Sequence, residues 1–250
     1  MRYLRVQKDG QAFYAALVDG CVRRLNGSPY VGAEYTGEEY GLDDVQLLPP
    51  CEPTKVVAVG LNYAKHAAEM KETLLGRPMI FIKPSTSLIA CGDEIVWPPI
   101  SNKVDYEAEL ALVIGKTCRN VTPEEAPNFI FGYTALNDVT ARDIQKGDGQ
   151  WTRGKSFDTF CPVGPYIDTD FDPAGKRVQS VLDGEIKQDG NTSDMLFKPA
   201  ELVSFISECM TLLPGDIVST GTPEGIGPLH RGGKIEVRIE GLETLHNTVV

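Results

Sequence analysis

The stretch that decides the fold is residues 105–115, with the sequence DYEAELALVIG. Its apolar second half is typical of a buried strand and is too short to cross a bilayer. In an extended chain Glu107 and Glu109 point to one face, about 6.5–7 Å apart, and their apolar neighbours point to the other. Two carboxylates this close repel each other unless a cation binds them or water solvates them. The pattern leaves two interpretations open, a metal site or a pair of surface glutamates at a strand end.

A third carboxylate occupies a similar place in the sequence. Residues 131–136 (FGYTAL) predict a strand that ends just before Asp138, and residues 139–145 predict a helix after it. An aspartate at such a junction either caps the helix or points into a pocket. Three oxygen ligands suit Mg²⁺ or Mn²⁺ far better than zinc, with water or substrate completing the octahedron. Asp138 therefore joins Glu107 and Glu109 as a candidate metal ligand.

A histidine and a glutamate lie on one predicted helix. Residues 55–59 (KVVAV) predict a strand, and the helix after it has Asn62 as a possible cap and runs through Leu74. His66 and Glu69 are three positions apart, so they share a face of this helix. A carboxylate beside a histidine fixes its tautomer and raises its basicity, which suits a general base acting on water. An ordinary surface pair has the same spacing, so both interpretations stay open.

Two loops carry further polar groups. Lys155 lies in a glycine-containing loop, where it either polarises a carbonyl or is one more exposed lysine. Residues 220–228 (TGTPEGIGP) follow a predicted strand and offer hydroxyl and backbone N–H groups that can receive a carboxylate, although plain turn-building is the alternative. This loop lacks the lysine of a Walker loop, so the sequence gives no support for nucleotide phosphate binding.

The rest of the chain is rich in predicted strands. Residues 1–50 predict a small β unit that ends in a proline-rich linker, so we expect a small N-terminal domain and a second domain over 51–250. Residues 181–186 predict a β-hairpin, residues 234–239 alternate as a strand, and Pro199 opens an amphipathic helix. Few helices, many strands and no βαβ rhythm predict an α+β, β-rich fold rather than a doubly wound sheet.

Charge and cysteine content exclude several classes of protein. The 250 residues include 24 Lys+Arg and 35 Asp+Glu, a net charge of −11. So acidic a chain has no basic footprint for a phosphate backbone, and nucleic-acid binding is not expected. The chain starts without a signal-peptide core and has no membrane-length apolar run, so we expect a cytoplasmic protein with no membrane partner. The six cysteines form no C-x-x-C motif and are expected to be reduced thiols.

Taken together, six ordered motifs resemble the fumarylacetoacetate hydrolase family. They are GLNY at 60–63 with His66 and Glu69, FIKP at 81–84, DYEAE at 105–109, NDVTARD at 137–143, KSFD at 155–158 and TGTPEGIG at 220–227. The resemblance runs in order from residue 55 to the C-terminus, and six motifs in order are far more specific than any one of them. Residues 1–50 resemble the short N-terminal domain of many bacterial-type members.

The resemblance implies a mixed β-roll catalytic domain, usually a homodimer, that acts on an anionic 2-oxo or β-diketo acid with Mg²⁺ or Mn²⁺. By matching motif positions it implies roles for nine residues. These are metal ligands at Glu107, Glu109 and Asp138, a water-activating dyad of His66 and Glu69, an enolate-stabilising Lys155, and substrate contacts at Arg142, Gln145 and Thr222.

The leading hypothesis is therefore a divalent-metal-dependent hydrolase that cleaves a C–C bond in an acylpyruvate or β-diketo acid through a metal-bound enolate. Because the same enolate serves other reactions, the alternative is an isomerase (tautomerase) or decarboxylase of 2-oxo or 2-hydroxy-dienoic dicarboxylic acids, such as 2-hydroxyhepta-2,4-diene-1,7-dioate or oxaloacetate. A catalytically silent homologue that only binds a metal or ligand is a more remote alternative. Leu61 stands where some acylpyruvases of the family carry arginine, and this difference bears on whether the substrate is an acylpyruvate.

Overall fold

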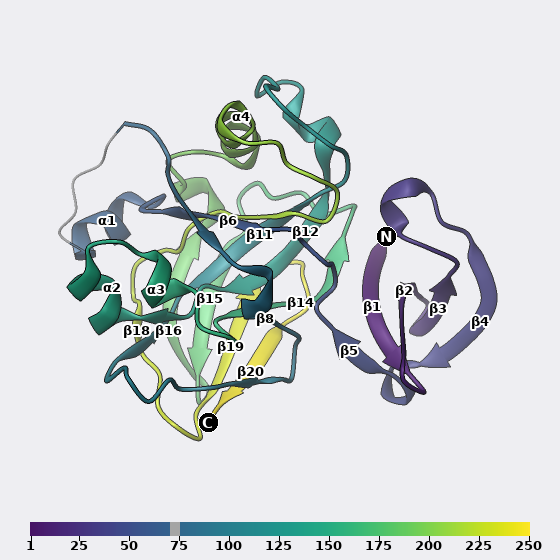
Figure 1. The fold of residues 1–250 in the computed structure, drawn as a ribbon, viewed down its shortest axis with the longest axis horizontal. Coiled ribbons are helices and arrows are strands. Elements are labelled where there is room, and N and C mark those ends of the chain that lie inside the picture. The colour runs from purple at the N-terminus through teal and green to yellow at the C-terminus, as the bar shows by residue number, and fades with distance from the viewer. Residues whose placement is uncertain (71–75) are drawn as a thin grey trace.

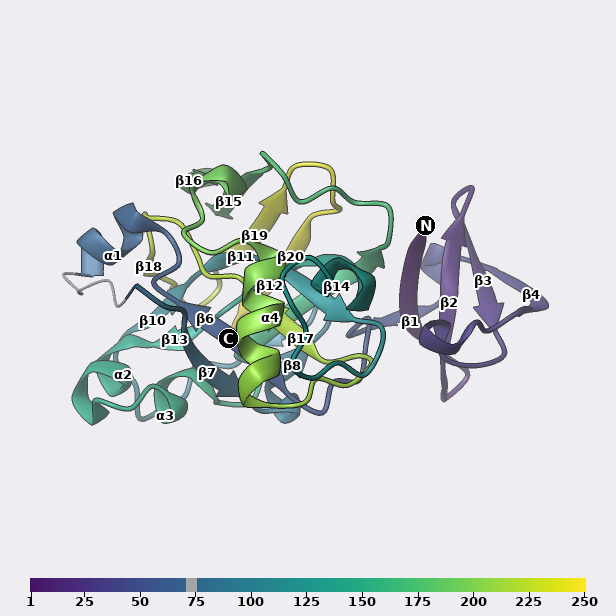
Figure 2. The ribbon, with the colours of Figure 1, turned by 90° about the horizontal axis from the view of Figure 1, so that it is seen from above.

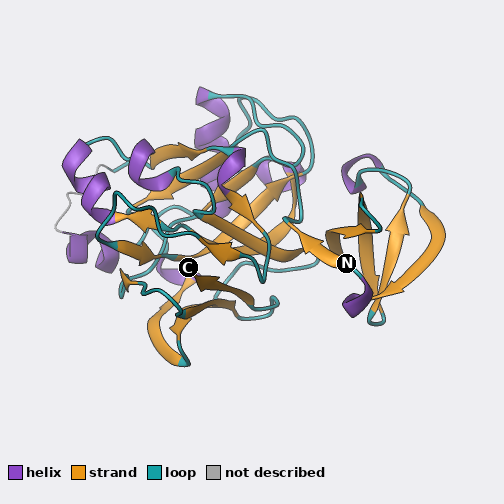
Figure 3. Ribbon diagram, turned by 60° about the horizontal axis from the view of Figure 1, so that its bottom comes forward, coloured by secondary structure: helices purple, strands orange, loops and turns teal. Residues whose placement is uncertain are grey.

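Strands dominate the computed structural model, which describes residues 1–70 and 76–250 (Figure 3). Strands account for 43% of the chain and helices for 18%, which confirms the predicted β-rich α+β fold. Within the described residues, none of the helices has the length and apolar character needed to cross a membrane. All six cysteines are free thiols, as expected.

The largest sheet has twelve strands and runs through the whole molecule (Figure 1). Its main path is β4 (Tyr35–Gly41), β3 (Cys21–Leu25), β2 (Gln11–Val18), β1 (Arg2–Lys8), β14 (Cys161–Asp168), β12 (Ile130–Asn137), β11 (Ala108–Ile114), β17 (Ile217–Ser219), β6 (Val56–Gly60) and β7 (Met79–Lys83). Off this path, β5 (Gln46–Leu48) pairs with β1 and β8 (Leu88–Ile89) pairs with β14. The order places β11 in the interior of the sheet.

Two smaller sheets and four α-helices complete the described part of the chain. One sheet is β13 (Thr140–Ala141), β10 (Val104–Tyr106) and β18 (Gly227–Pro228), and the other is β16 (Glu185–Asn191), β15 (Arg177–Leu182), β19 (Lys234–Ile239), β20 (Leu245–Val249) and β9 (Glu94–Ile95). The helices are α1 (Ala64–Met70), α2 (Arg142–Asp148), α3 (Thr152–Lys155) and α4 (Pro199–Cys209). Figures 1 and 2 show α1, α2 and α3 together at the end of the molecule opposite the N-terminal strands.

Every residue of β11 is buried, because strands pair with both of its edges and packed layers cover its faces. Leu112 belongs to a core cluster with Leu202 and Ile206 of α4. Leu110 belongs to another cluster with Val237 of the five-stranded sheet. Each such side chain contributes about 1.5–3 kcal/mol of transfer free energy when it is buried. The buried strand predicted from the apolar run is confirmed.

The N-terminal strands β1 to β4 form an antiparallel meander with a small core of its own. Figure 2 shows these strands set apart from the rest of the molecule. The meander continues into the rest of the large sheet where β1 pairs with β14, with Tyr3 opposite Ile167. Close by, the ring of Tyr30 packs edge-on against Phe131, with centroids 4.8 Å apart.

Several local sequence signals are confirmed. The hairpin predicted at 181–186 joins β15 to β16, and both Asp183 and Gly184 have positive φ, as a type I′ turn requires. Pro199 is the first residue of α4, where its missing N–H costs no hydrogen bond. The strand predicted at 234–239 is β19.

Two predicted helices differ from the structure. The helix expected from residue 139 begins only at Arg142, because Thr140 and Ala141 pair with β10 as strand β13. Asn62 does not cap α1, since its amide is held by the backbone of Phe197 and by the carbonyl of Thr220 instead. The predicted continuation of α1 to Leu74 lies outside the described residues.

Candidate active site

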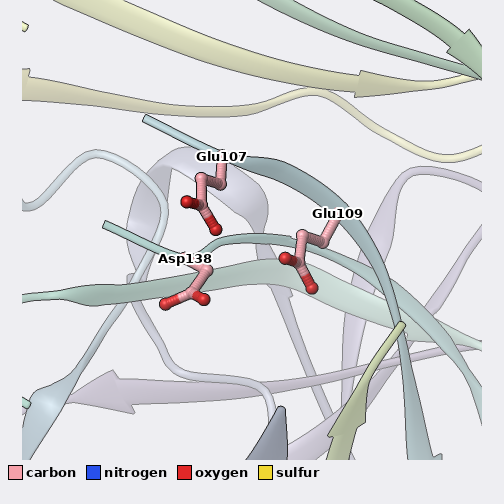
Figure 4. A group of neighbouring side chains, drawn as sticks. All are labelled: Glu107, Glu109 and Asp138. Atoms are coloured by element: carbon pink, nitrogen blue, oxygen red, sulfur yellow. The ribbon is translucent and has the colours of Figure 1, made fainter. Parts of the chain in front are cut away.

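Three buried carboxylates meet where β11 begins and β12 ends. Figure 4 shows the side chains of Glu107, Glu109 and Asp138 pointing toward one another, and each offers an oxygen within 4.8 Å of the others. The pairing of β11 with β12 brings them together, because the backbone N–H of Asp138 donates to the carbonyl of Glu107 at 2.9 Å. All three residues are at most 4% exposed, so the interpretation of Glu107 and Glu109 as surface glutamates is wrong.

Three buried cations compensate these carboxylates. Lys155 Nζ lies 2.8 Å from Glu107 Oε2 and 2.7 Å from Asp138 Oδ2, and Arg142 forms an ion pair with Glu107. Lys83 Nζ lies 2.5 Å from Asp138 Oδ1. Burying so many charges is favourable only when each is compensated. Glu107 and Asp138 have cationic partners, whereas Glu109 accepts hydrogen bonds from the neutral groups of Ser219 and Gly221.

The surroundings shift the pKa values of Glu107 and Glu109 in opposite directions. Burial raises the pKa of Glu107, but the charges of Lys155 and Arg142 outweigh this effect and hold its pKa well below the usual range. Burial raises the pKa of Glu109 well above the usual range, and the negative charges of Asp138 and Glu107 raise it further. Chemically identical groups with such divergent pKa values are typical of functional sites. A cation among these carboxylates relieves the repulsion between them.

Helix α1 supplies the histidine–glutamate pair. His66 Nδ1 lies 3.2 Å from Glu69 Oε2, so the two side chains share a face, as the spacing predicts. Glu69 also accepts a hydrogen bond from the backbone N–H of Gly225, with Oε1 at 3.2 Å. His66 is only 5% exposed and is therefore not part of an ordinary surface pair. The contact with Gly225 ties α1 to the loop 220–228.

One cavity is lined by most of the candidate site residues. Eight of the nine residues with implied roles line it, and Glu69 contacts it through His66. Its lining combines the carboxylates, Lys155 and Arg142 with the apolar side chains of Leu61, Met70, Phe81 and Trp151. The geometry therefore suits a small molecule with an anionic head and a less polar tail.

Lys155 does not lie in an exposed loop. It ends the short helix α3 and is 2% exposed, so the interpretation as one more surface lysine is wrong. Gly154 lets α3 pack closely on α2, because a Cβ at this position would lie 2.8 Å from the backbone of Gln145. This close packing brings Lys155 and Gln145 to the same cavity.

Sequence reasoning missed two buried charged residues behind the cavity. Lys83 donates to Asp138, to the carbonyl of Lys155 at 2.5 Å and to that of Val139 at 3.3 Å. Asp105 accepts from Arg142 Nε at 2.8 Å and so holds the guanidinium beside Glu107. The available signal was their place inside the FIKP and DYEAE motifs, where a charged residue interrupts an apolar or extended run.

A cluster of buried carboxylates beside a histidine–glutamate pair, in one cavity with a buried lysine and arginine, is typical of enzyme active sites. The comparison with protein families agrees with this class. Residues 55–250 match the family described as fumarylacetoacetate (FAA) hydrolase C-terminal, and residues 1–50 match the family described as Rv2993c-like, N-terminal. The chain belongs to the fumarylacetoacetate hydrolase family.

Individual relatives carry names for different reactions. The chain is 41% identical to the oxaloacetate tautomerase Fahd2a of Rattus norvegicus, over 82% of this chain and 69% of the relative. The crystal structure of 2-hydroxyhepta-2,4-diene-1,7-dioate isomerase from Mycobacterium marinum is 41% identical with a TM-score of 0.93, covering 100% of this chain and 98% of the other. The fumarylacetoacetate hydrolase of Exiguobacterium antarcticum is 36% identical with a TM-score of 0.85, covering 100% and 99%.

Proposed function

We propose that this chain is a divalent-metal-dependent hydrolase that cleaves a C–C bond in an acylpyruvate or related β-diketo acid. The observation that carries the proposal is that His66, paired with Glu69, lines the same cavity as the three carboxylates. Hydrolysis needs both parts, since one must stabilise the departing carbanion as an enolate and the other must activate water.

The residues present fit Mg²⁺ or Mn²⁺. Glu107, Glu109 and Asp138 would hold the ion through oxygen, the donor type that hard divalent cations prefer. Glu109 is oriented by neutral donors, because its Oε2 accepts from Ser219 Oγ and from the N–H of Gly221 at 2.9 Å. Bound there, the ion would supply a Lewis acid for the keto oxygen of a 2-oxo acid.

The side chains around the carboxylates have separate tasks in this proposal. Lys155 and Arg142 bring positive charge to the anionic head of the substrate and to the enolate that forms there. Glu69 engages Nδ1 of His66, which leaves Nε2 to take a proton from water. The water oxygen bonds to the distal carbonyl carbon, the C–C bond breaks toward C3, and the electron pair enters the enolate. A proton then returns to C3, giving a 2-oxo acid and a carboxylic acid.

An isomerase (tautomerase) or decarboxylase acting on a 2-oxo or 2-hydroxy-dienoic dicarboxylic acid is the second candidate. Leu61 lines the cavity where some acylpyruvases carry arginine, and the named relatives include a tautomerase and an isomerase. In that reaction His66 would move a proton between carbon and oxygen, and no water would be added.

The test is a product assay on acetylpyruvate, fumarylpyruvate and oxaloacetate, with added Mg²⁺ or with EDTA. The hydrolase proposal predicts pyruvate and the free acid by mass from acetylpyruvate and fumarylpyruvate, with loss of both on chelation, whereas pyruvate and CO₂ from oxaloacetate would indicate decarboxylation. It also predicts that His66→Ala abolishes cleavage, whereas His246→Ala, on the exposed face of β20, leaves it unchanged. Keto–enol interconversion that the protein accelerates above the spontaneous rate, without cleavage, would contradict hydrolysis and favour the tautomerase.

A further inference from the structure

The peptide between the two glutamates lacks a strand neighbour on one side. Strand β17 pairs with β11 only from Ala111 to Val113. At Ala108, side chains take the place of the missing strand. Gln188 Oε1 accepts from the N–H of Ala108 at 2.9 Å, and Thr222 Oγ1 donates to the carbonyl of Ala108 at 2.8 Å. Both polar groups of this buried peptide are thereby satisfied.

The two side chains also bind each other. Gln188 Nε2 donates to Thr222 Oγ1 at 2.7 Å and to the carbonyl of Pro223 at 2.8 Å. Gln188 is completely buried, and its acceptor and both of its donors are all used. Gln188, Thr222 and the Ala108 peptide therefore form a closed ring of three hydrogen bonds. This ring joins β16, the loop 220–228 and the start of β11.

The loop lies directly against β16, with no room between them. A Cβ at Gly190 would lie 2.4 Å from Pro223, and a Cβ at Gly225 would lie 2.4 Å from the carbonyl oxygen of Lys187. Both distances are far below van der Waals contact. Close packing of this kind fixes Gln188 and Thr222 relative to each other, as a positioning device requires.

The ring changes the role that the resemblance implies for Thr222. A hydroxyl group has one proton, and Thr222 gives its proton to the carbonyl of Ala108. One of its lone pairs accepts from Gln188, so toward the cavity it has only the other lone pair. An anionic substrate needs hydrogen-bond donors, which this hydroxyl does not offer.

We propose that Gln188 and Thr222 act as one unit that fixes the Ala108 peptide, and with it the spacing of the carboxylates of Glu107 and Glu109. Both are positioning residues for the divalent ion. The inference rests on the proposed metal site. Outer-shell groups that orient ligands typically change metal affinity about 10–100-fold when they are removed.

The test is a double-mutant cycle on Mn²⁺ affinity, measured as free Mn²⁺ by electron paramagnetic resonance. Gln188→Leu and Thr222→Val should each weaken binding about 10–100-fold. The double variant should be no weaker than the worse single variant, because either change breaks the same ring. Thr222→Ser keeps the hydroxyl and should restore binding. The matched control is Gln179→Leu on β15, whose buried Nε2 has no hydrogen-bond partner among the described residues.

The outcomes separate the inference from the metal site itself. Normal Mn²⁺ binding by the wild type and by a folded Gln188→Leu variant would overturn the inference alone. If Gln188→Leu does not fold, Thr222→Val decides: unchanged Mn²⁺ affinity with a raised KM at saturating Mn²⁺ would make Thr222 a substrate contact and overturn the inference. Failure of the wild type to bind any ion would remove the proposed metal site, and the inference with it.

Discussion

The ammonium nitrogen of Lys155 lies 2.7 Å from Oδ2 of Asp138, inside the cluster of carboxylates. The same nitrogen lies 2.8 Å from Oε2 of Glu107. Lys155 therefore holds two of the three proposed ligands together as a protein-borne cation. A divalent ion that binds these oxygens competes with Lys155 for them, and displacing the lysine frees its charge for the substrate.

This competition predicts the behaviour of Lys155→Met. Without its ammonium group, the metal-free protein should lose about 3–5 kcal/mol of stability, because buried carboxylates lose a partner. Added Mg²⁺ should then stabilise the variant more than it stabilises the wild type. Urea unfolding with and without Mg²⁺ measures both effects, and Lys234→Met, at an exposed position, is the control. An equal Mg²⁺ effect in variant and wild type would contradict the competition.

The contact between His66 and Glu69 predicts a catalytic effect without a metal effect. Glu69→Gln keeps the size of the side chain but loses the charge that supports His66, so kcat should fall about 10–100-fold. Mn²⁺ affinity should stay the same, because Glu69 is not among the proposed ligands. Steady-state kinetics and a Mn²⁺ titration check this, with Glu208→Gln on the exposed face of α4 as control. A matching loss of Mn²⁺ affinity would place Glu69 in the metal site instead.

Gly60 and Trp151 predict a steric effect on the apolar part of the cavity lining. A Cβ at residue 60 would lie 2.4 Å from Cζ3 of Trp151, so Gly60→Ala should displace the indole, cost about 1–3 kcal/mol of stability and raise KM. Adding Trp151→Ala should remove most of the extra cost, since the clash is with that ring. Gly147→Ala in α2, where a Cβ meets nothing within 4 Å, should instead stabilise by about 0.5–1 kcal/mol. If thermal unfolding shows that the stability losses of Gly60→Ala and Trp151→Ala simply add in the double variant, the clash is not present.

His230 and Asp183, an exposed pair away from the cavity, predict a pH dependence of stability. His230 Nε2 lies 2.6 Å from Asp183 Oδ2, and this hydrogen bond raises the pKa of His230 above 6.5. A hydrogen bond from the backbone of Lys234, followed by that from His230, lowers the pKa of Asp183.

Because the pKa of His230 is raised and that of Asp183 is lowered, the pair stabilises the fold most at pH values between the two. The stability that His230 contributes to the folded protein is fully present below its unfolded pKa and is lost as pH rises through its folded pKa. The stability that Asp183 contributes is present above its unfolded pKa and is lost as pH falls through its depressed one. Because the chain has three histidines, an imidazole NMR titration resolves the effect. Asp183→Asn should lower the pKa of His230 toward 6.5, and an unchanged titration would show that the pair is not formed in solution.

Much of this architecture could be predicted because its signals are local. The apolar run after Glu109 predicts the buried strand, and the turn residues Asp183 and Gly184 predict the hairpin. The order of six short motifs indicates the family and the residues of the cavity. These features depend on neighbours within a few positions, so the amino-acid sequence contains them directly.

The rest depends on partners that are distant along the chain. The amide of Asn62 binds the carbonyl of Phe197, 135 positions away, so its apparent role as a helix cap is lost. Lys83 reaches Asp138 across 55 positions, and Gln188 reaches Ala108 across 80. A local pattern can mark such a side chain, as the FIKP motif marks Lys83, but it does not identify the partner, because only the assembled sheets bring the two together.

The most direct test of the account is a Mn²⁺ titration of the wild type and of Asp138→Asn, followed by electron paramagnetic resonance. The central claim is that Glu107, Glu109 and Asp138 form one divalent-metal site, with Asp138 supplying an essential charged ligand. The account predicts one tightly bound ion per wild-type chain and binding at least about 10-fold weaker in the variant. Equal binding by the two proteins, or no binding by the wild type, would contradict it.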